Sequence, residues 1–225
     1  MPQTPVPPAT LMRGMLLDAF HNGHTLPLHW TEVTVGPLVV TAAADAMKAP
    51  LGEHAAVRLP VSYAETVEIC RALDCLPPTK AICDAMFAQA RAQLHYVGLV
   101  RTAQDSKKMR SAEFTLRFDA RVEEQRAKHV LQPTDLVFGA WKLWLFHPKV
   151  TVRGAVNYGF WDTKKRPPKP IQSPGTRHDA AHYDYSQLLQ PVRREARRVS
   201  DGTTVDLLAE IAGNRPDWKR AASAF

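Results

Sequence analysis

The sequence predicts an α+β fold, in which N-terminal helices pack on a mainly antiparallel sheet. Between residues 64 and 128, apolar side chains recur mostly at the spacing of helices. From residue 135 onward, segments rich in Val, Trp and Phe have the character of strands, and no internal repeat interrupts this order. Helices followed by strands are typical of the α+β class.

The N-terminal part of the chain begins with a proline-rich segment. We expect residues 1–8 to form an extended arm and residues 9–225 to form a single domain. Thr10 can cap a helix that continues to residue 20, where Asn22 and Gly23 end it. Valine-rich segments separated by Gly-Pro and Pro-Leu-Gly then predict three strands, at residues 33–35, 38–44 and 55–61.

The rest of the chain predicts further helices before the strands. Thr79 follows two prolines and can cap the second of these helices. Helices are expected at residues 64–73, 79–94, 111–128 and 204–212, and strands at 135–146, 150–161 and 183–199. The tryptophans and phenylalanines between residues 141 and 161 have strand spacing and are expected in the core, while 164–170 is expected to be a solvated loop.

Composition limits the class of protein. Apolar residues make up 45% of the 225 residues and charged residues 23%, which is ordinary for a folded soluble protein. The three cysteines fall within fourteen residues of mostly helical sequence, which argues against a disulfide framework. There is neither a secretory signal nor an apolar run long enough to span a membrane. We expect a cytoplasmic protein as synthesised, which another route or a particle can deliver elsewhere.

The chain is basic, with a net charge of +7 and a pI near 9.5. Basic residues gather at 107–110, 164–166 and 193–198. Such clusters favour anionic partners, such as an acidic cell-wall polymer, nucleic acid or phospholipid head groups, or they simply solvate the surface. The clusters contain almost no aromatic residues, which makes nucleic acid the weaker candidate.

Residues 176–186 gather more proton-transferring groups than any other part of the chain: two histidines, two aspartates, two tyrosines and a serine. His178 and His182 have the spacing of two metal ligands on a helix, with Asp179 or Asp184 as a further ligand. No histidine or cysteine follows them, so we expect no metal and no cofactor. Ser186 lacks the glycine elbow of a serine nucleophile.

A cysteine nucleophile is the alternative that uses the same region. Cys75 lies just ahead of the helix that begins near Thr79, where the helix dipole can favour a thiolate. His178 can act as its general base and Asp184 can orient the imidazole. Against this, most free cysteines are small buried hydrophobic residues.

Several segments together resemble a group of poorly characterised bacterial proteins. The resemblance involves Cys75-Leu76-Pro77-Pro78-Thr79 with the helix that follows, residues 155–161 and 171–172, and His178 through Asp184-Tyr185-Ser186. It covers roughly residues 55–212 and implies a shared fold.

Residues 133–138, Pro-Thr-Asp-Leu-Val-Phe, are similar to a segment of NlpC-type and papain-like cell-wall cysteine peptidases. This similarity implies a papain-like arrangement. The chain lacks the Asp-Cys-Ser-Gly nucleophile motif of those enzymes, and its base would come from His178 instead of the next strand.

The leading hypothesis from the sequence is a cysteine-dependent amide hydrolase, a peptidoglycan amidase or endopeptidase that uses Cys75, His178 and Asp184. The second hypothesis is a non-catalytic structural or binding component of a phage particle or a secretion apparatus. In that case the histidines and tyrosines pack, and the arm and basic clusters dock partners. A nucleic-acid-binding protein is the third.

Overall fold

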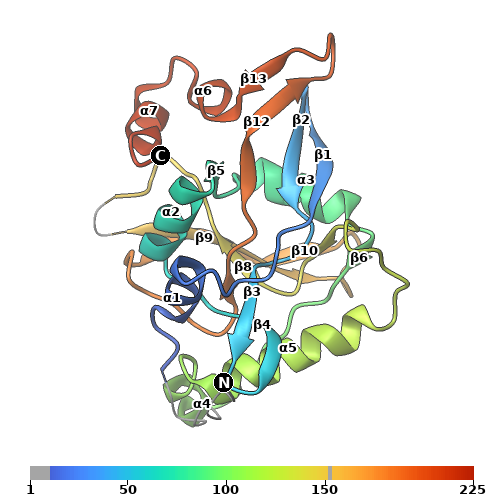
Figure 1. Ribbon diagram of the computed structural model, residues 1–225, viewed down its shortest axis with the longest axis vertical. Helices are drawn as coiled ribbons and strands as arrows, with labels where there is room; N and C mark the ends of the chain where they lie inside the picture. The colour runs from blue at the N-terminus through green and yellow to red at the C-terminus, as the bar shows by residue number, and fades with distance from the viewer. Residues whose placement is uncertain (1–10, 152–153) are drawn as a thin grey trace.

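The computed structural model describes residues 11–151 and 154–225. The predicted proline-rich arm at 1–8 therefore lies outside the described residues. Within the described ranges the chain combines helices with largely antiparallel sheets, which confirms the α+β class (Figure 1).

The helices and strands are short and numerous. The helices are α1 (Met15–His21), α2 (Tyr63–Ala72), α3 (Lys80–Gln89), α4 (Ala103–Lys107), α5 (Ala112–Arg126), α6 (Leu207–Ala212) and α7 (Pro216–Ala222). The strands are β1 (Trp30–Val35), β2 (Leu38–Ala43), β3 (Lys48–Leu51), β4 (His54–Arg58), β5 (Cys75–Leu76), β6 (Ala92–Gln93), β7 (Val137–Phe138), β8 (Lys142–Trp144), β9 (Ala155–Asp162), β10 (Lys169–His178), β11 (Gln187–Leu188), β12 (Val192–Arg198) and β13 (Thr204–Asp206).

Two main sheets organise the described chain. One has the order β1-β2-β12-β13, with β5 also paired to β12, and the other has the order β10-β9-β8-β11. The pairs are antiparallel except for β8 with β11 and β6 with β7. In Figure 1 the first sheet rises at one end of the molecule, while α4 and α5 lie at the other end and α7 lies beside the first sheet. Strands from early and late parts of the chain therefore share one sheet.

Side-chain caps explain where several helices begin. Ser62 and Glu65 form a reciprocal capping box at α2, and the Thr79 hydroxyl accepts from the amide of Ile82 at 3.3 Å. Ser111 caps α5 through the amide of Phe114. These local signals confirm the predicted helix starts at α2, α3 and α5 to within one residue. The helix predicted to start at the Thr10 cap instead begins at residue 15. The helix predicted at 79–94 ends at residue 89, before β6.

The prediction of a loop at residues 164–170 was wrong for residues 169 and 170, because β10 begins at Lys169. Pro170 and Pro174 lie within this strand, and proline cannot donate a hydrogen bond to a neighbouring strand. The strand tolerates them because it is at the edge of its sheet, paired with β9 alone. The sequence could not reveal this edge position.

Two predicted long strands are divided in the structure. The segment 135–146 breaks between β7 and β8, where Gly139 has φ +122° and a Cβ would lie 2.3 Å from the backbone oxygen of Leu94. The strand predicted at 183–199 was also wrong at its start, because residues 183 and 184 belong to no strand and residues 185 and 186 form a turn before β11. Such close backbone approaches and turns depend on distant partners.

Four of the five aromatic residues predicted to be in the core, Trp141, Trp144, Phe146 and Trp161, are buried, whereas Phe160 is half-buried. Trp141 and Trp144 are both almost fully buried and belong to two adjoining apolar clusters. The indole of Trp141 donates to the Gln190 side chain at 3.1 Å, and that of Trp144 donates to the backbone oxygen of Val61 at 2.8 Å. The indoles of Trp141 and Trp144 thus have their hydrogen bonds satisfied, whereas the buried Nε1 of Trp161 has no hydrogen-bond partner among the described residues.

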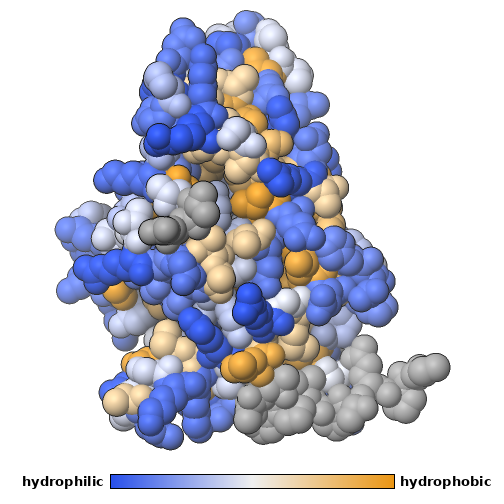
Figure 2. Space-filling model, turned by 90° about the vertical axis from the view of Figure 1, so that its left-hand side faces the viewer, coloured by the Kyte–Doolittle hydropathy of each residue, from blue (hydrophilic) through white to orange (hydrophobic). Residues whose placement is uncertain are grey.

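The surface is mainly hydrophilic on the side shown in Figure 2, with apolar residues gathered in a band along its middle. Folded proteins normally expose many apolar groups on their surface. Across residues 11–151 and 154–225, no helix has the length and apolar character needed to cross a membrane.

Candidate functional site

The aspartate of the predicted triad lies in a buried polar cluster. Asp184 is 1% exposed, and its Oδ2 accepts from the Lys142 ammonium at 2.7 Å. Its Oδ1 accepts from the hydroxyl of Ser186 at 2.5 Å and from the amide of the same residue at 2.9 Å. Burial opposes ionisation, but the charge of Lys142, the hydrogen bonds from Lys142 and Ser186 and the nearby His182 ring hold the Asp184 pKa below its ordinary value. Asp184 is therefore an ionised anchor for β8 and for its own turn.

The two histidines of the cluster stack on each other. The rings of His178 and His182 lie 3.8 Å apart at 15°, and the edge of His178 meets Trp144 at 6.5 Å. His182 Nδ1 lies 3.2 Å from the Arg110 guanidinium. Because arginine can only donate, this nitrogen accepts, and the proton of the neutral ring lies on Nε2, 3.8 Å from Asp184 Oδ2.

The imidazole beside Asp184 is thus His182, whereas the sequence paired Asp184 with His178. Burial lowers the pKa of His178, and the neighbouring His182 and Lys142 lower it further. Among the hydrogen bonds and ion pairs of the described residues, none joins His178 to Asp184.

Cys75 lies in β5, antiparallel to β12, and is 3% exposed. Its thiol donates to the backbone oxygen of Leu73 at 3.3 Å. Burial raises the pKa of Cys75 to about 11, although Arg193 partly opposes this. The residue precedes the Thr79 cap by four positions, which is too far for the dipole of α3 to act strongly. No described hydrogen bond connects Cys75 with His178 or Asp184, so this geometry is that of a packed thiol.

We expect Cys75 to react with iodoacetamide at about pH 8 roughly 100-fold more slowly than an exposed cysteine. A pKa near 11 in place of 9.0 leaves about 100-fold less thiolate. Mass spectrometry of the modified peptides gives the rate for each cysteine, and denaturing urea should abolish the protection. Fast modification in the folded protein that His178→Ala slows would instead show a working Cys75–His178 pair.

The tyrosines of the same segment attach it to its neighbours. The Tyr185 hydroxyl accepts from the amide of Leu99 at 2.9 Å. Arg110 lies over the Tyr183 ring at 5.3 Å and also donates to its backbone oxygen at 3.2 Å. Residues 183–186 therefore hold the chain before α4 and the turn before α5, and these two segments lead to the next site.

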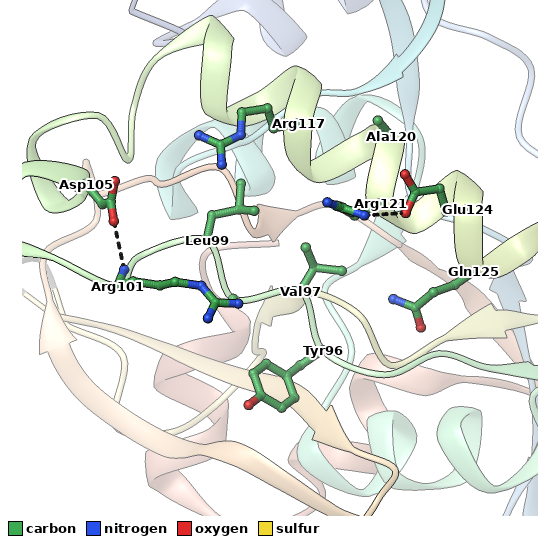
Figure 3. A pocket seen from close by; sticks show the side chains of 11 residues that line it. Tyr96, Val97, Leu99, Arg101, Asp105, Arg117, Ala120, Arg121, Glu124 and Gln125 are labelled. Atoms are coloured by element: carbon green, nitrogen blue, oxygen red, sulfur yellow. Dashed lines mark hydrogen bonds and ion pairs between the residues drawn. The ribbon is translucent and has the colours of Figure 1, made fainter.

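A cleft lies between residues 96–101, α4 and α5, with a volume of about 620 Å³ (Figure 3). We call it the arginine cleft, because three arginines line it together with two carboxylates, a tyrosine and small or apolar groups. Its principal side chains are Tyr96, Val97, Leu99, Arg101, Asp105, Arg117, Arg121 and Glu124. Cavities of this size are typical of sites for small ligands.

Local interactions position the walls of the arginine cleft. Asp105 Oδ2 accepts from the backbone amides of Arg101 and Thr102, each at 3.0 Å, so the turn into α4 is fixed. On α5, the residues at 117, 121 and 124 lie three or four apart and share one face. The Gln125 side chain bonds both the amide and the carbonyl of His95, at 2.7 and 2.9 Å, which ties residues 95–96 to α5.

The cleft arginines differ in how far they are neutralised. Arg121 pairs with Glu124 at 2.8 Å, whereas Arg117 reaches Glu113 only at 3.5 Å. Arg101 is exposed, and its guanidinium has no partner within residues 11–151 and 154–225. Arg101 is therefore available to an anionic ligand, while Arg117 is held only by its long pair with Glu113 and by the Phe114 ring, 5.2 Å away.

By contrast, the basic cluster at 193–198 is largely paired. Its arginines 194, 197 and 198 contact Asp206, Glu32 and Glu210, respectively. Arg193 lies over the Trp30 ring at 4.4 Å. The sequence pointed to this cluster and missed the arginine cleft, because the cleft residues are spread over 96–125 among acidic residues. In the sequence, this cleft was indicated only by the helix cap before α4 and by charged residues spaced three or four apart along α5.

Comparison with family models, curated proteins and solved structures found no match. We therefore argue function from the residues themselves. Of the residues that the structure describes, no three or more His, Cys, Asp or Glu side chains are grouped so that they could hold a metal ion. The arginine cleft is the candidate site with available charge.

Proposed function

We propose that this protein is a non-catalytic binding protein, which recognises an anionic polymer through the arginine cleft. The observation that carries the proposal is the available guanidinium of Arg101, which lines a cleft of about 620 Å³ together with Arg117. Arginine presents a planar set of donors that matches carboxylate and phosphate groups. The net charge of +7 adds long-range attraction for the same class of partner.

The buried polar cluster supports a structural role for residues 178–186. Asp184, Lys142 and Ser186 satisfy one another, and the adjoining tyrosines hold the segments that build the cleft. Cysteine-dependent hydrolysis by Cys75, His178 and Asp184, and with it a papain-like arrangement, stays a prediction. The burial of Cys75 and its raised pKa favour the binding function over it.

The double variant Arg101→Gln/Arg117→Gln is expected to bind dextran sulfate at least about tenfold more weakly than the wild type. Each arginine loses charge-assisted hydrogen bonds, and one such bond is worth about a factor of ten. Fluorescence anisotropy with labelled dextran sulfate gives the affinity, and neutral dextran should not bind. Binding by the wild type should weaken steeply as salt is added.

The matched control is Lys219→Gln/Arg220→Gln, which removes the same charge from α7, far from α4 and α5 (Figure 1). It should bind almost as well as the wild type. An equal loss in the control would assign binding to the general charge of the surface and overturn the proposal. Release of soluble fragments from peptidoglycan that is lost in Cys75→Ala would overturn it in favour of the hydrolase.

A further inference from the structure

The arginine cleft contains acceptors and an aromatic ring as well as cations. Three arginines face two carboxylates, so the lining carries only a small positive excess. That balance suits a ligand with isolated single charges better than a polyphosphate. The ligand should also offer groups for which carboxylates and a tyrosine are partners.

The carboxylates of the cleft retain acceptor capacity. In the described part of the chain, the hydrogen bonds of Asp105 use Oδ2, and Glu124 bonds Arg121 through Oε2. The second oxygen of each carboxylate can therefore accept from a ligand. An ionised carboxylate can only accept, so its ligand partner must be a donor such as a hydroxyl group.

Tyr96 supplies a ring at the edge of the same cleft (Figure 3). Its backbone amide donates to the Trp161 carbonyl at 2.9 Å, and its ring contacts His95 at 4.4 Å and Phe160 at 6.0 Å. These contacts hold the half-buried ring in place. A held aromatic ring provides an apolar platform for the face of a cyclic ligand.

From these contacts we propose that the arginine cleft binds a sugar that carries a carboxylate, such as a hexuronic acid residue of a polymer. Arg101 and Arg117 bind the sugar carboxylate, Asp105 and Glu124 accept from its hydroxyl groups, and Tyr96 packs on its ring. This inference rests on the proposed function, because it names the ligand class of the same cleft.

The test compares three probes of matched length by isothermal titration calorimetry: trigalacturonic acid, neutral maltotriose and N-acetyl-triglutamate amide. The first carries sugar rings with carboxylates, the second only sugar rings and the third only carboxylates. Trigalacturonic acid should bind at least about tenfold more tightly than the triglutamate, because the hydroxyl and ring contacts add to the charge. Maltotriose should bind the weakest.

Three variants separate the contributions. Tyr96→Leu should weaken trigalacturonic acid several-fold and leave the triglutamate almost unchanged, whereas Arg101→Gln should weaken both. Tyr96→Phe retains the ring and should retain binding. An unchanged melting temperature shows that a variant is folded.

Equal affinity for trigalacturonic acid and the triglutamate would overturn the sugar inference while leaving anion binding intact. Tighter binding of a thymidine trinucleotide than of trigalacturonic acid would overturn it in favour of nucleic acid. If neither these probes nor dextran sulfate bind, the proposed function fails as well.

Discussion

Replacement of Arg58 by methionine is expected to lower the free energy of unfolding by about 3–5 kcal/mol, the usual cost of removing one partner of a buried ion pair. The Arg58 side chain is fully buried and lies 5.5 Å from the Trp141 ring. It pairs with Asp45 and Asp119, each at 2.6 Å, and with Glu123 at 2.7 Å. Methionine would leave these carboxylates close together without their central cation.

The loss should depend on pH in a defined direction. Burial disfavours the charge on Glu123, but Arg58 and Lys48 lower its pKa to about 2 from the ordinary value of 4.5. A carboxylate with a lowered pKa contributes its stability above the pKa of the unfolded chain and loses it as the pH falls through the folded value. The difference between wild type and Arg58→Met should therefore shrink below about pH 4.5.

Urea unfolding at several pH values measures both effects. Arg198→Met is the control, because it breaks an exposed pair with Glu210 at 2.6 Å, which should cost no more than about 1 kcal/mol. If Arg58→Met cost as little as this control, the buried network would not be the electrostatic centre that the structure indicates.

Asp184→Asn is expected to destabilise the protein by a similar amount, about 3–5 kcal/mol, because it leaves the buried Lys142 ammonium without its anion. The Asp184 pKa is lowered, so its contribution is present above the ordinary aspartate range near 4 and is lost as the pH falls below it. The stability of Asp184→Asn should consequently change less between about pH 5 and pH 2 than that of the wild type.

A double variant tests whether Lys142 and Asp184 are directly coupled. Lys142→Met/Asp184→Asn removes both charges, and it should recover part of the stability that Asp184→Asn loses, because no unpaired ion stays buried. Thermal and urea unfolding of the four proteins complete the cycle. Additive losses would contradict a direct Lys142–Asp184 pair.

The sequence predicted the local parts of this structure well. The Thr79 cap, the charged helix that became α5 and the buried tryptophans depend on neighbours within a few residues or on simple periodicity. The edge strand β10 was missed because its prolines are tolerated only at an edge, and pairing decides which strand is at an edge.

The candidate site was harder to predict than the fold. Cys75 precedes a helix in the sequence, but its short strand pairs with β12 and places the thiol among apolar residues. His178 and Asp184 are near in sequence, yet a turn brings His182 and the distant Lys142 to the carboxylate instead. Proximity along the chain identified the polar cluster and could not assign its pairs.

The amino-acid sequence is enough to predict the α+β class, several helix starts, most of the buried aromatic residues and the basic character of the protein. Which charges are buried and which are available depends on how the chain packs. Asp184 meets a lysine 42 positions away, and Arg58 meets an aspartate 61 positions away. Such pairs leave no periodic pattern, because their partners are set by how strands and helices pack. For the same reason, only the packed chain shows Arg101 and Arg117 facing one cleft.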